Sequence, residues 1–178
     1  AVLIGKWSEA AMVIVLCVYP LSFTQIYTGH DLNFHLSRID CIAENIRHGK
    51  LLSPIYYTHL DGYGYASPLF YGDIFLHIPG LLVVMGMQVE TSLRVFIMMI
   101  TTFTAFATYY CSQKMFGNKL GSLTAAIAYT FSSYFCVDFI TRVAIGELQT
   151  FAFIPLIAYG FYSIVCEDGK KWYLLPLG

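Results

Sequence analysis

Four windows without a single charged residue constrain this chain more than any other feature of its sequence. Each window is 18 or 19 residues long, and together they are residues 10–27, 95–113, 120–137 and 148–166. The hydrocarbon core of a bilayer takes roughly 20 apolar residues in a helix. We therefore predict an all-α, polytopic transmembrane protein. Its predicted spans are residues 8–27, 91–113, 119–137 and 148–166.

Composition supports a membrane protein and argues against several other classes. Of the 178 residues, 57% are hydrophobic and 12% are charged, whereas soluble domains average about 25% charged residues. The net charge is −1 and no basic stripe is present, so nothing indicates a nucleic-acid partner. The five cysteines lack CxxC spacing, and His30, His48 and His59 lack ligand spacing. No metal site is therefore predicted, and any cofactor, including a divalent cation, stays unknown.

A long polar loop separates the first two spans, and its first part predicts a helix over residues 31–48. Apolar residues recur there at helical spacing, charged residues mostly occupy the other face, and Gly49 ends the pattern. The segment is too polar to span. We expect it to lie along the membrane with its apolar face against the lipid.

The second part of the loop, residues 68–87, is apolar but interrupted by Asp73, His77 and Pro79. It predicts either a second helix parallel to the membrane or a short span. Positive residues favour the cytoplasmic side, and the connectors 113–119 and 167–171 have only lysines as basic residues. If both are cytoplasmic, the loops 28–90 and 138–147 are extracytoplasmic and 68–87 does not cross. We favour that arrangement; if 68–87 crosses, the two loops lie on opposite sides.

The chain is expected to be the N-terminal part of one transmembrane domain. It lacks an initiator Met, and Lys170-Lys171-Trp172 followed by an apolar stretch is typical of a membrane boundary at the start of another helix. A C-terminal remainder is therefore expected to be missing.

Asp31 is the first candidate for chemistry, because it follows the first span and opens the predicted surface helix. His35 and Arg38 lie one and two turns further along the same face. A carboxylate placed there is suited to accept a proton from a hydroxyl, and the guanidinium is suited to hold a phosphate. The alternative is that Asp31 only caps the helix.

Arg142 and Glu147 form a second candidate, on the loop that the favoured topology places on the same side as Asp31. Ionisable groups near membrane depth are often functional. The alternative is a loop salt bridge, with Glu147 stabilised by the dipole of the following helix. Asp61 and Tyr63 lie in a loop rich in Tyr and Gly; they are suited to bind a sugar, or they anchor the loop at the membrane interface.

The order of these elements resembles the N-terminal part of YfhO-like bacterial membrane proteins and of membrane proteins labelled pyruvoyl-tetrahydropterin-synthase-related. The residues that carry the resemblance are Gly29-His30-Asp31-Leu32, Phe34-His35-Leu36, Arg38-Ile39, Gly62 to Tyr71, Arg142-x-Ala144-x-Gly146-Glu147 and Pro155-Leu156. These families are similar to the GT-C superfamily of glycosyltransferases. Asp31 has no second acidic residue beside it, which departs from the acidic pairs common in that superfamily.

The resemblance implies an enzyme of the bacterial plasma membrane that builds the cell envelope. It would transfer a sugar from a polyprenyl-phosphate donor to an extracytoplasmic glycan, lipid or protein acceptor. Asp31 and Glu147 would be the catalytic acids, with His35, Arg38, Arg142, Asp61 and Tyr63 binding substrate. Two alternatives stay open: a transporter or flippase for a lipid or small molecule, and a non-catalytic membrane assembly protein.

Overall fold

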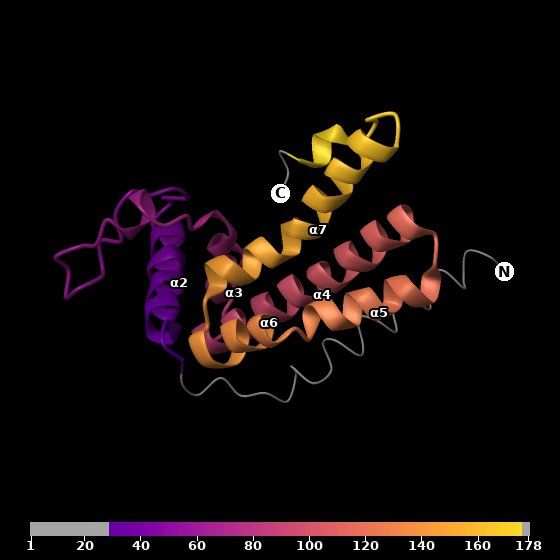
Figure 1. Ribbon diagram of the computed structural model, residues 1–178. Coiled ribbons are helices and arrows are strands. Elements are labelled where there is room, and N and C mark those ends of the chain that lie inside the picture. Colours follow the sequence, from indigo (N-terminus) through magenta and orange to yellow (C-terminus); the bar gives the residue numbers. More distant parts are fainter. Residues whose placement is uncertain (1–28, 176–178) are drawn as a thin grey trace. The chain divides into compact units, whose positions relative to one another are not determined.

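The computed structural model describes residues 29–175, and in this range it is built of helices without a named strand (Figure 1). The predicted span 8–27 lies outside the described residues. The described chain divides into two compact units, one ending at Ile97 and the other starting at Met98. Each unit is described by itself below.

The first unit begins with α2 (Leu32–Arg47), which matches the helix predicted over 31–48. Its end is set by Gly49, whose positive φ of 75° places it in the left-handed region. There the Gly49 and Lys50 amides donate to the carbonyls of Ile46 and Asn45, which satisfies the free carbonyls of the last turn.

The apolar face of α2 packs against α3 (His77–Val84). Ile39, Ile42 and Ala43 are buried. A β-carbon on Gly80 of α3 would lie 2.7 Å from Ile42 Cγ2, so the two helices approach closely there. The expectation that α2 lays this face on the lipid is therefore corrected, because the face is covered by α3.

Residues 68–87 do not form the single helix that was predicted. The structure has a 3-10 turn η1 (Ser67–Leu69), a non-helical stretch, a second turn η2 (Ile74–Leu76), and then α3. The apolar helical stretch Ile74–Val84 falls below the length of a candidate span. Its 11 residues rise only about 16 Å, roughly half of a bilayer core, so as a helix it is too short to cross.

Three segments are long and apolar enough to cross a membrane: Val89–Phe116, Lys119–Arg142 and Ile145–Cys166. They correspond to the predicted spans 91–113, 119–137 and 148–166. The first is α4 (Val89–Phe116) and the third is α7 (Ile145–Cys166). The middle segment is interrupted and consists of α5 (Lys119–Thr130), α6 (Ser133–Val137) and a π-helical turn η3 (Asp138–Arg142).

Within the second unit, α4 and α5 are joined by two residues and run antiparallel (Figure 1). Ala105 and Ala126, both fully buried, form the contact, with Tyr109 and Leu123 packed against them. Small residues at such a contact let two membrane helices approach closely.

The third long helix of this unit, α7, is fixed by its Phe151. The Phe151 ring contacts the rings of Tyr129, Tyr134 and Phe135, and the Tyr129 hydroxyl donates to the Phe151 carbonyl at 3.2 Å. Another short turn, Val143–Ala144, reverses the chain between η3 and α7. The connector 138–147 is therefore at the opposite end of these helices from the lysine-bearing connectors 113–119 and 167–171. A short 3-10 turn, η4 (Trp172–Leu174), follows α7.

Candidate functional site

A cluster of four polar side chains lies where η3 turns into α7. Tyr134 comes from α6, Asp138 and Arg142 from the two ends of η3, and Glu147 from the first turn of α7. The turn ends at Val143, which has a φ of 55°, and the Ala144 amide donates to the Asp138 carbonyl at 2.9 Å. π-Helical turns of this kind often occur at functional sites.

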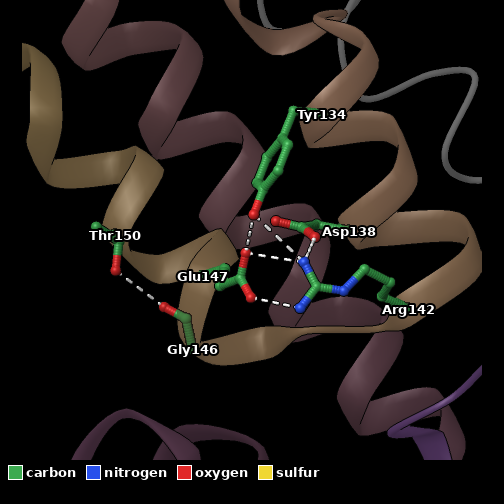
Figure 2. Close-up of polar contacts among 6 residues, drawn as sticks. All are labelled: Tyr134, Asp138, Arg142, Gly146, Glu147 and Thr150. Carbon is green, nitrogen blue, oxygen red and sulfur yellow. Dashed lines mark hydrogen bonds and ion pairs between the residues drawn. The ribbon is translucent and has the colours of Figure 1, made fainter.

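The Arg142 guanidinium joins the cluster, as Figure 2 shows. Its Nη1 donates to Asp138 Oδ1 at 2.7 Å and to Glu147 Oε2 at 2.9 Å, and its Nη2 donates to Glu147 Oε1 at 2.6 Å. The Tyr134 hydroxyl donates to Glu147 Oε2 at 2.5 Å. Glu147 is thus gripped on both oxygens, so its orientation is fixed by Arg142 and Tyr134.

The two carboxylates differ in their surroundings. The side chain of Glu147 is 41% exposed and that of Arg142 is 35% exposed, whereas that of Asp138 is fully buried. Asp138 Oδ2 has no hydrogen-bond partner. A buried polar atom without a partner is costly, and two carboxylates against one guanidinium leave the cluster with one excess negative charge. Asp138 Oδ2 is therefore the atom of this cluster that is open to a further donor.

This cluster includes the predicted pair Arg142 and Glu147, and it is the salt bridge that the sequence offered as an alternative. Asp138 was not among the predicted site residues. The signal that points to it is its spacing of four residues from Arg142, which places both side chains on one side of a helical turn.

Asp31 occupies the N-cap position of α2, and its side chain makes no capping hydrogen bond. The residue is exposed. Capping would have held the carboxylate against the free amides of the first turn. The alternative that Asp31 serves as a capping group is therefore not what the structure shows.

Arg38 lies elsewhere than expected, because it is fully buried rather than exposed beside Asp31. Its Nη2 donates to the carbonyls of Tyr71 and Gly72 at 3.1 and 3.0 Å. Its guanidinium carbon lies 4.6 Å from the centre of the Tyr71 ring and 5.3 Å from that of Phe34. Arg38 thus holds the segment after η1 onto α2, which corrects its expected role as an exposed phosphate ligand.

His35 is also buried, at 1% exposure. Burial lowers its pKa to about 4, and the nearby Arg38 charge acts in the same direction, while Asp31 opposes it. The imidazole is therefore neutral at physiological pH. The predicted surface trio is accordingly reduced to one exposed member, Asp31.

Asp61 and Tyr63 lie in an exposed loop that is closed by a bridge between Tyr56 and Tyr65. Asp61 has a positive φ of 55°. The structure places both residues at the tip of this loop, on the surface of the first unit, where they remain candidates for binding a ligand.

Three further polar contacts in the first unit were not predicted. The Tyr56 hydroxyl donates to Asp73 Oδ2 at 2.8 Å, and burial together with this bond raises the pKa of Tyr56. Ser37 Oγ lies 2.7 Å from His59 Nδ1. Cys41 Sγ lies 3.8 Å from the same nitrogen, but burial raises the pKa of this thiol, which disfavours a thiolate. These contacts join α2 to the loop that follows it.

Among residues 29–175, no group of three or more His, Cys, Asp or Glu side chains is arranged to hold a metal ion. Comparisons with protein-family models, with curated proteins and with solved structures find no match for this chain. The class that the structure itself defines is a helical protein with three described segments able to cross a membrane, which is compatible with an integral membrane protein.

Proposed function

We propose that this chain is part of a membrane glycosyltransferase that moves a sugar from a polyprenyl-phosphate carrier to an extracytoplasmic acceptor. The resemblance to YfhO-like and GT-C proteins supports the proposal. The observation that carries it is the state of Asp31: an exposed carboxylate that opens α2 without capping it. Its oxygens are thus not committed to the first turn and are available to an acceptor hydroxyl.

In the proposed reaction, Asp31 takes the proton of the acceptor hydroxyl as the oxygen attacks the anomeric carbon. The bond from that carbon to the carrier phosphate breaks, and polyprenyl phosphate leaves with the bonding electrons. A single displacement inverts the anomeric configuration. The acceptor is a glycan, a lipid or a protein, and the same chemistry serves all three.

Glu147 is the second acid of the proposal. Arg142 and Tyr134 orient its carboxylate, which suits a group that positions a substrate hydroxyl. Arg142 is already bound to two carboxylates and Arg38 is buried. The proposal therefore assigns the carrier phosphate to neither arginine; Arg142 positions Glu147 instead.

The test uses the full-length protein in its own host. A strain without the gene is complemented with the parent, Asp31→Asn or Asp40→Asn, and polyprenyl-phosphate sugars are measured in lipid extracts by mass spectrometry. Asp40 is a matched control, because it is exposed on the same helix. We expect Asp31→Asn to accumulate the lipid-linked sugar like the deletion strain, at unchanged protein level, and Asp40→Asn to behave as the parent. A parental lipid pool in the Asp31→Asn strain would rule out this role.

One observation favours a transporter as a second candidate. Asp138 is buried at the end of an apolar segment, has an oxygen without a partner, and lies at a π-helical interruption. Ionisable groups of this kind and broken helices mark substrate or proton paths in transporters. For a transporter, Asp138→Asn would abolish function while Asp31→Asn would not, and no variant would change the chemistry of the lipid-linked sugars.

A further inference from the structure

The helix α3 and the turn before it carry an apolar face that has no role in the proposed site. Ile74, Ile78, Leu81 and Met85 follow one another at intervals of four, three and four residues, which places them on one side of a helix. They are 70, 37, 45 and 73% exposed, respectively. The residues therefore form a continuous apolar stripe that is not packed inside the unit.

The opposite side of the same segment is buried. Leu76, Pro79, Gly80 and Val83 are buried, and Gly80 lies against Ile42 of α2. The segment is thus apolar on both sides, with α2 covering one side only. A helix that is apolar all round is expected inside a protein core or in a membrane.

The polar atoms of this segment do not need water. Residues 74–87 contain no Asp, Glu, Lys or Arg, and His77 is their single polar side chain. His77 Nε2 lies 2.7 Å from the Leu51 carbonyl oxygen, and Nδ1 lies 3.0 Å from that of Asp73. Both ring nitrogens therefore find partners within the chain, which lowers the cost of placing this helix at an apolar boundary.

We propose that the stripe formed by Ile74, Ile78, Leu81 and Met85 inserts into the lipid bilayer, at the boundary between headgroups and acyl chains. Continuity with α4 argues for lipid as the occupant. α3 ends at Val84, and α4, which is long enough to cross a membrane, begins at Val89.

Five peptide steps reach at most about 18 Å, so the end of α3 stays close to the membrane level at which α4 begins. The α2 helix then rests on α3, on the side away from the lipid. Its exposed residues Asp40 and Arg47 face water. This arrangement is independent of the proposed glycosyl transfer, and it assigns contact with lipid to α3 rather than to α2.

The experiment is site-directed spin labelling of the full-length protein in phosphatidylcholine–phosphatidylglycerol vesicles. The native cysteines are first replaced, and single cysteines are then introduced by Ile74→Cys, Ile78→Cys, Leu81→Cys or Met85→Cys, with Asp40→Cys and Arg47→Cys as controls. Collisions of each nitroxide with oxygen, which concentrates in lipid, are compared with collisions with a water-soluble nickel chelate. Ile74 and Met85 are mostly exposed, so labels there do not disturb packing.

We expect the four stripe positions to collide several-fold more with oxygen relative to the nickel chelate than the two controls do. Equal ratios at stripe and control positions would show that the stripe faces water and would overturn the proposal. Labels shielded from both reagents would also overturn it, because a protein surface, from this chain or from a partner, would then cover the stripe. Neither result depends on whether Asp31 is catalytic.

Discussion

Replacing Arg38 by Met removes the cation that holds the segment after η1 against α2. Met fills a similar volume but cannot donate to the carbonyls of Tyr71 and Gly72, which Arg38 Nη2 contacts at 3.1 and 3.0 Å. The substitution also removes the stacking on the Tyr71 and Phe34 rings. We expect the segment from Ser67 to Gly72 to open more often as a result.

The size of the effect follows from these contacts. A hydrogen bond from a charged donor contributes about 1.5–3 kcal/mol, and a desolvated cation–π contact contributes about 2 kcal/mol. Against this, Met avoids the cost of burying a cation, which is several kcal/mol. Because the two carbonyls stay in place without their donor, we expect a net loss of about 3 kcal/mol for the closed segment. That corresponds to about 100-fold more frequent opening.

Hydrogen–deuterium exchange of the full-length protein in nanodiscs measures this opening. The Leu69, Phe70 and Tyr71 amides donate to the Ala66 and Ser67 carbonyls and report on the segment.

Arg47→Met is the matched control for this measurement. It is the same substitution on the same helix, at a side chain that is 46% exposed and paired with Glu44, and it should leave exchange in the segment unchanged. Parental exchange in Arg38→Met as well would refute the reasoning, because the guanidinium would then not hold the segment.

Three further results are expected. Burial lowers the pKa of His35 to about 4, so the unfolded state binds the proton first; stability is full above pH 6.5 and falls by about 3 kcal/mol towards pH 4, a loss that His35→Gln should abolish in pH-dependent melting. Gly80→Ala should cost about 1–3 kcal/mol through its contact with Ile42, and Gly72→Ala, with open space around its β-carbon, should not, as thermal unfolding would show. Single cysteines should label from outside at two sites and not at the third, and opposite-side labelling of the first two would contradict the favoured topology; the substitutions are Asp61→Cys, Ile145→Cys and Phe116→Cys.

The helical class and the long helices could be predicted from the sequence because both depend on local composition. A window without charge is long enough to cross a membrane whatever lies beside it, and the pattern of 31–48 repeats at the period of a helix. The same pattern showed that α2 has an apolar face but not what covers it. That cover is α3, some 40 residues later in the chain, and its contact depends on the missing side chain of Gly80.

The role of Arg38 could not be predicted for a related reason. An arginine on the polar side of a helical pattern is normally exposed. It is buried here because Tyr71 and Gly72, more than 30 residues away, turn their carbonyls towards it. The break within 68–87 had local signals in Asp73 and Pro79, but where the helix begins is set by packing against α2.

The two carboxylates at η3 separate the two functional candidates more sharply than the sequence did. Glu147 is partly exposed and has partners on both oxygens, so it is built to hold one orientation, which suits positioning of a substrate. Asp138 is buried and has one oxygen without a partner, so it is built to gain a ligand or a proton, which suits transport. Arg142 binds both and transmits a change at either acid to the other. A phenotype confined to Asp138→Asn would therefore favour transport, and one shared by Asp31→Asn and Glu147→Gln would favour glycosyl transfer.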